Sequence, residues 1–282
     1  MAYLDLTPAL HDQLRTWLAE DLGRGDLTAP ALQGLSGRGH WLAKQDGVFC
    51  GGVLVEPLFR MLDPDLRVHL LVTDGTPVRS GQRLLELEGS AAALVAGERT
   101  ALNLAMRLSG IATATAALVA QLAGTGVALA DTRKTTPGLR VLEKYAVRCG
   151  GGINHRLGLD DAAMLKENHL AWAGGVGPAI AAIRAASPWP ARVIVEAETA
   201  PEALAAVAAG ADGVLLDEFS PEALLQLVPQ LRQEAARLVR SLVLEASGVQ
   251  PEQLAAYAAT GIDLISTSAP ITRSAWLDLS MR

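Results

Sequence analysis

The chain has 282 residues and a formal net charge of −6, and half of its residues are hydrophobic. This length and composition provide enough apolar surface for a large buried core, and they exclude a disordered chain. The acidic balance argues against nucleic acid as a partner, and no run approaches the roughly 18 uninterrupted apolar residues of a membrane span.

The first residues predict a helix rather than a secretory signal. The segment MAYLDLTPALHDQL lacks the basic start and apolar centre of a signal peptide. Thr7 and Pro8 are typical of an N-cap and a first helical position, so we expect an amphipathic helix over residues 7–21. The cytoplasm is therefore the default location.

The two cysteines predict free thiols. Cys50 and Cys149 are far apart in the sequence and belong to no CxxC or Cys/His pattern. In a cytoplasmic protein such cysteines are more often thiols than a disulfide, and their spacing indicates no structural zinc site.

A small α+β unit is predicted before residue 110. Its turn signals are Asp46-Gly47, Asp74-Gly75 and Ser80-Gly81. Between them we expect strands at 39–43, 66–73 and 83–87 and a helix at 53–62. Residues 92–122 are helical in pattern, with an interruption expected at Ser109-Gly110, where we place the domain boundary.

After this boundary the chain alternates between strand and helix. Six short apolar runs predict strands, separated largely by helical segments rich in Ala and Leu; they are 127–132, 162–166, 192–196, 213–217, 242–246 and 262–266. Such alternation implies parallel strands. The spacing suits a barrel, and a doubly wound open sheet is the competing architecture.

Polar residues follow the carboxyl ends of these runs. They are Thr132-Arg133, Lys166, Glu196, Asp217, Glu245-Ala246-Ser247 and Ser266-Thr267-Ser268. Barrel enzymes assemble their sites at this end, and open parallel sheets also bind ligands there. The pattern therefore predicts a functional site under either architecture.

The segment from Asp131 to Gly158 is cationic in an acidic protein. It carries six basic residues, Arg133, Lys134, Arg140, Lys144, Arg148 and Arg156, against the two acids Asp131 and Glu143. Those next to Gly/Pro loops, together with His155, predict a pocket for a small, multiply charged anion. Arg140, Lys144 and Arg148 recur every four residues, so for them the exposed face of a helix is an equally good interpretation.

Glu196 and Asp217 are also expected at the carboxyl ends of the strands. They would repel an anion unless a divalent cation lies between the carboxylates and the anion, or unless the reaction develops positive charge beside the carboxylates. Both conditions hold in the transfer of a phosphorylated sugar from pyrophosphate, and hard oxygen ligands favour Mg²⁺ over zinc. The loops at Ser247-Gly248 and Ser266-Thr267-Ser268 offer hydroxyl and backbone N–H groups for a sugar phosphate. The residues therefore predict a Mg²⁺-dependent enzyme that acts on a phosphosugar and an anionic acceptor.

Five segments closely resemble the quinolinate phosphoribosyltransferase family. They are ERTALN (98–103), RLSGIAT (107–113), DTRKTTPG (131–138), GGGINHRLGL (150–159) and LKENH (165–169). The resemblance implies an N-terminal α+β sandwich domain over residues 1–110, followed by an open α/β barrel over 111–268. It also implies that residues 269–282 pack back on the N-terminal domain.

The implied reaction is a decarboxylating transfer from phosphoribosyl pyrophosphate to quinolinate, which yields nicotinate mononucleotide, pyrophosphate and CO₂ for NAD biosynthesis. The implied assembly is a homodimer with shared active sites, or a hexamer built as a trimer of dimers. No nucleic acid or membrane partner is expected.

The resemblance also implies roles for individual residues. Those that would hold the quinolinate carboxylates are Arg99, Arg133, His155 and Arg156. Lys134, Lys166, Glu196 and Asp217 would be catalytic, with Glu196 and Asp217 serving the ribose and Mg²⁺. The remaining substrate-binding residues would be Thr132, Thr135, Ser247, Gly248, Val249 and Ser268.

The chain departs from the family at three of its positions. Ile194 stands where relatives commonly have an earlier glutamate, and Ser268 stands where they have a glycine. Val249 replaces the second glycine of a Ser-Gly-Gly loop, and a valine resists the positive φ that glycine allows. Phosphate-binding geometry is the feature that these changes put in question.

Three alternative functions remain open at this stage. Two are related enzymes or proteins: a molybdenum-transport-associated paralogue, which we expect to lack the full NHRLGL and LKENH segments, and a non-decarboxylating nicotinate phosphoribosyltransferase. The third is a non-catalytic anion-binding barrel, against which the retained Glu196 and Asp217 argue.

Overall fold

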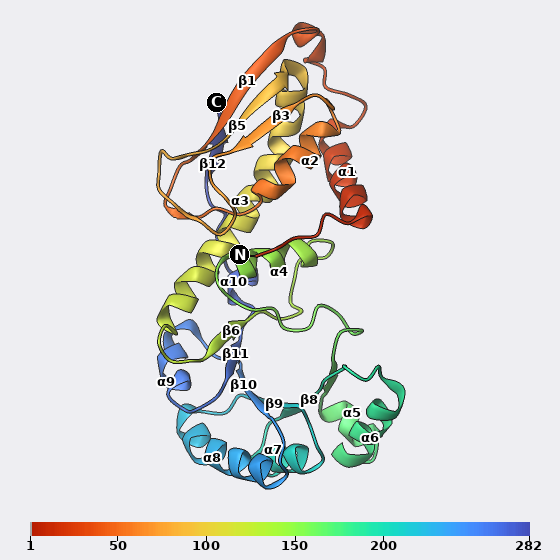
Figure 1. Ribbon diagram of the computed structural model, residues 1–282, viewed down its shortest axis with the longest axis vertical. Helices are drawn as coiled ribbons and strands as arrows, with labels where there is room; N and C mark the ends of the chain where they lie inside the picture. The colour runs from red at the N-terminus through yellow and green to blue at the C-terminus, as the bar shows by residue number, and fades with distance from the viewer. Residues whose placement is uncertain (1) are drawn as a thin grey trace. The chain divides into compact units, whose positions relative to one another are not determined.

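A computed structural model describes residues 2–282 (Figure 1). The chain forms two compact units. The first contains the N-terminal part up to Ala116, Val141–Gly151 and Arg273–Arg282, and the second contains Ala117–Arg140 and Gly152–Thr272. The boundary expected at residue 110 therefore falls inside the first unit, and residues 141–151, which were expected in the barrel, also belong to that unit.

An antiparallel sheet of order β12-β1-β5-β3 forms the frame of the first unit. Its strands are β1 (Ser36–Ala43), β3 (Arg67–Leu70), β5 (Arg83–Ser90) and β12 (Leu279–Met281), and β2 (Gly47–Val48) pairs with β4 (Pro77–Val78) beside it. Trp41 lies opposite Leu85 and both are fully buried. Because strand side chains alternate between faces, Arg38 and His40 lie on the opposite face from Trp41. The sheet thus has one apolar and one charged face.

The first unit has helices over the three predicted ranges, 7–21, 53–62 and 92–122, and further helical segments outside those ranges. All of these helices together are α1 (Pro8–Leu22), η1 (Ala29–Leu32), η2 (Gly52–Leu54), α2 (Val55–Arg60), α3 (Ala91–Gln121), which continues into the second unit, and α4 (Arg140–Cys149). The helix expected at the start is confirmed, because the Thr7 hydroxyl accepts a hydrogen bond from the Leu10 N–H at 3.3 Å and Pro8 is the first helical residue.

The interruption expected at Ser109-Gly110 is wrong, because α3 is continuous through both residues. The glycine has another purpose. A Cβ on Gly110 would lie 2.1 Å from the carbonyl oxygen of Ala275, so the C-terminal segment crosses the helix where a side chain is missing. The N–H of Leu277 bonds the Met106 carbonyl at 3.0 Å, and the chain then continues to β12 beside β1 (Figure 1).

By length and composition alone α3 would be able to cross a membrane, although the sequence has no uninterrupted apolar run of that length. Half of its most apolar window is buried inside the structure. Buried residues such as Leu102, Ala105, Leu108 and Ile111 belong to the core. The apolar composition of α3 is therefore used for packing.

The exposed helix face proposed for Arg140, Lys144 and Arg148 is wrong for Lys144. The lysine is only 1% exposed in α4, next to Glu143, which is fully buried. The Glu143 carboxylate pairs with Arg107 on α3 at 2.8 Å. Residues four apart lie on the same face of a helix, but this spacing does not show whether the face is exposed to solvent or buried against other parts of the protein.

The second unit contains all six predicted parallel strands. They are β6 (Ala128–Ala130), β7 (Ala163–Leu165), β8 (Val193–Ala197), β9 (Gly213–Asp217), β10 (Val243–Ser247) and β11 (Leu264–Ser266). Their spatial order is β6-β11-β10-β9-β8-β7. From β7 to β11 each strand lies beside its successor, and β6 follows β11, so the order runs around a ring that is open between β6 and β7. A doubly wound sheet would instead reverse direction midway, and this decides in favour of an open barrel.

The helices of the barrel unit lie between and after these strands. They are α5 (Glu167–Trp172), α6 (Val176–Ala186), α7 (Ala200–Ala208), α8 (Pro221–Arg237), η3 (Pro251–Gln253), α9 (Leu254–Ala258) and α10 (Ala269–Thr272). Thr199 and Ser220 cap the N-termini of α7 and α8 with their hydroxyls, which fixes where each helix begins after its strand.

Alternation along the strands separates the core from the site. Val195, Val214, Leu244 and their alternate neighbours join the buried apolar cluster beneath the helices. The residues between them face the barrel interior, where pairing of the strands places Glu196, Leu215 and Glu245 at one level. Asp217 and Ser247 pair one layer higher. The barrel therefore presents a polar interior toward its carboxyl end.

The close approach at Gly110 makes a testable prediction about stability. We expect Gly110→Ala to lower the free energy of unfolding of the first unit by about 1–3 kcal/mol, because the new methyl group displaces the C-terminal segment from α3. Gly177→Ala in α6 is the control, since its Cβ meets no atom within 4 Å. That change should raise stability by about 0.5–1 kcal/mol. Urea denaturation measures both, and equal effects of the two substitutions would contradict the packing described.

Candidate functional site

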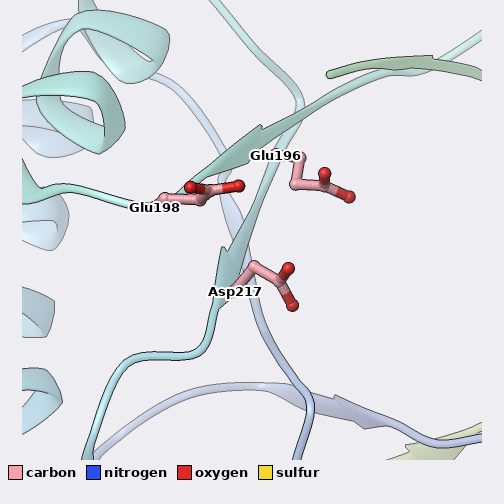
Figure 2. Close-up of side chains that lie close together, drawn as sticks. All are labelled: Glu196, Glu198 and Asp217. Atoms are coloured by element: carbon pink, nitrogen blue, oxygen red, sulfur yellow. The ribbon is translucent and has the colours of Figure 1, made fainter. Parts of the chain in front are cut away.

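Three carboxylates converge at the carboxyl ends of β8 and β9. Figure 2 shows Glu196 and Asp217 on neighbouring strands, with Glu198 just beyond β8. One oxygen from each lies within 4.8 Å of the other two. Glu196 and Asp217 were predicted to lie together, whereas Glu198 was missed. The sequence already indicated Glu198, because it follows Glu196 by two residues and residues two apart on a strand share a face.

Each predicted carboxylate already has a protein partner. The Lys166 ammonium group, at the end of β7, donates a hydrogen bond to Glu196. The Ser247 hydroxyl on β10 donates to Asp217 at 2.7 Å. Directly after Asp217, Glu218 has a φ of 56°, a left-handed conformation that is unfavourable for a residue with a side chain. The strand ends thus hold both carboxylates in defined positions.

The electrostatic environment of Glu198 is unfavourable for a third negative charge. Desolvation, and after it the negative charges of Glu167 and Asp217, raise the pKa of Glu198 above its ordinary value. A bound cation would relieve this repulsion. Three carboxylate oxygens are hard ligands of the kind that Mg²⁺ prefers, so the donor set fits a divalent cation.

The cationic side of the site comes from the segment after β6. The Thr132 hydroxyl accepts a hydrogen bond from the Lys134 N–H at 3.0 Å, which turns the chain and leaves the side chains of Arg133 and Lys134 exposed. The Thr135 hydroxyl accepts from Arg140 at 3.0 Å. Both predicted threonines therefore shape the loop that presents the basic groups.

Arg156 is more enclosed than Arg133 and Lys134, which are both exposed. Its guanidinium donates to the Ala162 carbonyl at 2.9 Å. Burial, and after it the positive charge of Arg133, lower the pKa of Arg156. The two arginines are thus close enough to repel each other, and an anion between them would stabilise both charges.

His155 lies deeper, with a side chain that is 9% exposed, and contacts Glu245 on β10. Its Nε2 atom is 3.1 Å from Glu245 Oε2, and its Nδ1 accepts the Arg156 N–H at 2.7 Å. The backbone N–H of His155 donates to Asp131 at 2.9 Å, and the Asn154 amide donates to the same carboxylate at 2.7 Å. From the sequence, Glu245 was expected only as a strand-end residue without a role of its own.

A cavity of about 480 Å³ opens beside this pair within the barrel unit. Residues at the amino ends of the strands line it, including Ile194, Gly213 and Val243, together with His155 and Glu245. Ile194, at the position for which the resemblance implies a glutamate, lines this cavity. Its side chain does not disturb the cluster of Glu196, Glu198 and Asp217.

The predicted phosphate loops lie after β10 and β11. Gly248 carries the positive φ, at 75°, whereas Val249 does not and packs its side chain into the barrel core. The strain expected at Val249 is therefore absent. The Ser268 carbonyl accepts the N–H groups of Ile271 and Thr272, which starts α10. Both loops lie at the same barrel end as Asp217.

Arg99 lies on α3 in the first unit and its side chain is exposed. The other predicted site residues all belong to the second unit. Within that unit, direct contacts link Lys166 with Glu196 and Asp217 with Ser247.

Two family models match the chain. The model described as Quinolinate phosphoribosyl transferase, N-terminal domain, matches residues 26–109, and the model described as Quinolinate phosphoribosyl transferase, C-terminal domain, matches residues 111–282.

Similarity to individual proteins extends over nearly the whole chain. The probable nicotinate-nucleotide pyrophosphorylase (carboxylating) of Synechocystis sp. is 46% identical over 272 residues, which cover 95% of this chain and 90% of the relative. The nicotinate-nucleotide pyrophosphorylase (carboxylating) of Mycobacterium leprae is 41% identical over 270 residues, covering 93% and 92%. The crystal structure of NadC from Streptococcus pyogenes superposes with a TM-score of 0.91 at 37% identity and covers 99% of this chain and 98% of that one.

The raised pKa of Glu198 predicts how cation binding depends on pH. A raised pKa means that Glu198 takes up its proton at a higher pH than an ordinary glutamate, and a proton competes with a metal ion for the carboxylate. We therefore expect the affinity for Mn²⁺, a probe for Mg²⁺, to fall as the pH is lowered from about 7.5 toward about 5, and Glu198→Gln to weaken binding at the higher pH by about tenfold.

Titration of the ligand-free protein with Mn²⁺, followed by electron paramagnetic resonance, measures both effects. Glu234→Gln on α8, outside the cluster, is the matched control. The same affinity in Glu198→Gln and in the wild type at the higher pH would contradict a role for Glu198 in the cation site.

Proposed function

The chain belongs to the quinolinate phosphoribosyltransferase family, and we propose that it transfers the phosphoribosyl group of phosphoribosyl pyrophosphate to quinolinate with loss of CO₂. The ring nitrogen forms a bond to the anomeric carbon of the ribose while the bond from that carbon to pyrophosphate breaks. The bond between the ring and one carboxylate then breaks, CO₂ leaves, and the ring carbon takes a proton. The products are nicotinate mononucleotide, pyrophosphate and CO₂, for use in NAD biosynthesis.

One observation supports this reaction best: at the carboxyl end of the barrel, Lys166 bonds Glu196 of the carboxylate cluster, and the loop with Arg133 and Lys134 follows β6. A dicarboxylate acceptor needs the basic groups. A ribose that becomes positively charged at its anomeric carbon needs the carboxylates. A site for an anion alone would be weakened by Glu196, Glu198 and Asp217, so their presence argues against a non-catalytic anion-binding barrel.

The basic groups bind the acceptor and the leaving group in this proposal. Arg133 and Arg156 hold the quinolinate carboxylates through bidentate hydrogen bonds, with His155 beside them. Lys134 is exposed on the loop and meets the charges of the substrate and pyrophosphate. Lys166 moves between its bond to Glu196 and the acceptor, so ligand binding changes which partner the lysine serves.

The carboxylates serve the ribose. Glu196 and Asp217 accept hydrogen bonds from the sugar hydroxyls and stabilise positive charge at the anomeric carbon as pyrophosphate departs. Mg²⁺ held by Glu196, Asp217 and Glu198 would neutralise charge on the pyrophosphate leaving group.

In this proposal the 5-phosphate of the ribose binds to the loops that follow β10 and β11. Ser247 and Gly248 with the backbone of Val249, and Ser268 at the start of α10, supply hydroxyl and N–H groups for its oxygens. Thr132 and Thr135 complete the substrate loop after β6. Because Gly248 alone carries the positive φ in the first of these loops, Val249 is compatible with this role.

The proposed assembly is a cytoplasmic homodimer, alone or as part of a hexamer. Each subunit would contribute Arg99 to the site of its neighbour, where it adds a charge for the quinolinate carboxylates. This arrangement explains an exposed arginine within a motif of the family resemblance.

The activity itself is tested by acceptor choice. We expect pyrophosphate release from phosphoribosyl pyrophosphate with quinolinate, and at least about 100-fold lower kcat/KM with nicotinate, because the smaller acid leaves an enclosed arginine without its carboxylate. A coupled pyrophosphate assay and ¹³CO₂ release from carboxyl-labelled quinolinate give the two readings. Equal use of both acids, or pyrophosphate release without CO₂, would refute the assignment.

The shared site is tested by subunit exchange. We expect Arg99→Ala and Lys166→Ala each to be inactive as homodimers. In a mixed dimer, one site would carry both defects and the other neither, so activity should return to about half of the wild-type value per dimer.

Tagged subunits allow the mixed species to be purified and counted before the assay. Mixed dimers of two conservative Arg15→Lys and Arg237→Lys variants, which alter exposed arginines outside the site, control for the exchange procedure. If purified mixed dimers show no recovered activity, Arg99 acts within its own chain.

A further inference from the structure

The buried pair of His155 and Glu245 has a defined hydrogen-bonding direction. The backbone N–H of Arg156 donates to His155 Nδ1 at 2.7 Å. A ring nitrogen that accepts a hydrogen bond carries no proton, so the proton of a neutral imidazole must be on Nε2. That proton then points to Glu245 Oε2, 3.1 Å away.

Glu245 has little else to bind. Its side chain is 4% exposed, and its second oxygen, Oε1, is buried without a hydrogen-bond partner in the part of the chain that the structure describes. A buried carboxylate oxygen without a partner is costly, and such an arrangement is retained where the group has a function. The orientation of the carboxylate is therefore determined by His155.

The position of this pair in the barrel gives it a structural effect. The ring of strands is open between β6 and β7, and Ile153 forms a parallel bridge to Ala130 at the edge of β6. The chain then passes through His155 to Arg156. Glu245 lies on β10, which is separated from β6 by β11. The hydrogen bond from His155 to Glu245 therefore holds the segment at the opening against the interior of the barrel.

Two further bonds fix the segment on either side of the ring. Asp131, at the end of β6, accepts the His155 N–H at 2.9 Å, and Arg156 donates to the Ala162 carbonyl at 2.9 Å. The backbone of Arg156 is held by His155 Nδ1 and its guanidinium by Ala162. Rotation of the imidazole ring would release the first of these restraints.

We propose that Glu245 is a positioning residue that holds His155 as the neutral Nε2–H tautomer and, through it, fixes Arg156 for the acceptor carboxylate. This inference rests on the proposed function for the identity of the acceptor. It assigns His155 a role in orientation, because both of its ring nitrogens are engaged within the chain. It also gives a role to a carboxylate that lies level with Glu196 in the strand register but does not belong to the carboxylate cluster.

The tautomer is tested in the ligand-free protein, independently of activity. Long-range ¹H–¹⁵N correlation at neutral pH, with the His155 signals assigned by their loss in His155→Asn, should show the pattern of an Nε2–H neutral ring. An Nδ1–H tautomer or an imidazolium at this pH would overturn the proposal, whatever the enzyme turns over.

The positioning role is tested by two substitutions. In Glu245→Gln the amide oxygen still accepts the Nε2–H, so the KM for quinolinate should stay within about twofold of the wild type. In Glu245→Ala the ring is released, and that KM should rise about tenfold or more, with kcat and the KM for phosphoribosyl pyrophosphate within about threefold.

Glu234→Ala is the control for loss of a glutamate elsewhere in the barrel unit, and circular dichroism checks the fold of each variant. An unchanged KM in Glu245→Ala would overturn the positioning role. So would an equal loss in Glu245→Gln, because charge rather than acceptor geometry would then be what matters. If Glu245→Ala fails to fold, the KM of Glu245→Gln and the tautomer of His155 still test the proposal. A wild-type enzyme without activity on quinolinate would refute the proposed function and not the tautomer.

Discussion

The site depends on the period of two along a β-strand within an open parallel barrel. Residues such as Val195, Val214 and Leu244 pack beneath the helices and supply the hydrophobic core. The residues between them face the interior, and there the chain places Glu196, Asp217, Glu245 and Ser247. Stability and chemistry are thus assigned to opposite faces of the same strands, and parallel pairing brings Glu196, Asp217 and Ser247 to the carboxyl end of the barrel.

Much of this arrangement was predictable because it is local in the sequence. A polar residue after each apolar run predicted where Lys166, Glu196 and Asp217 would gather, and alternation of strand and helix predicted parallel pairing. The ring order was not predictable from local pattern, since it depends on β6 joining β11 across most of the unit. Glu198 was missed although the period of two already placed it on the same face as Glu196.

Other features depended on contacts between distant segments. Gly110 predicted a helix break, but in the structure the glycine admits the C-terminal segment, which no local pattern reveals. Lys144 had the spacing of an exposed helix face and is buried in α4. Glu245 looked like one more strand-end residue until the fold brought His155 against it. For Gly110 and Glu245 the partner is distant in the sequence, so propensity and charge patterning carried no information about it.

The central claim is that opposite charges divide one barrel end between an anionic acceptor and a ribose. A crystal structure of the protein with quinolinate tests it most directly. We expect the two carboxylates of the ligand to lie against Arg133, Arg156 and Lys166, with the ring nitrogen directed toward Glu196 and Asp217. Quinolinate bound instead on the charged face of the four-stranded sheet, where Arg38, Arg67 and Arg83 line a groove, would contradict the account.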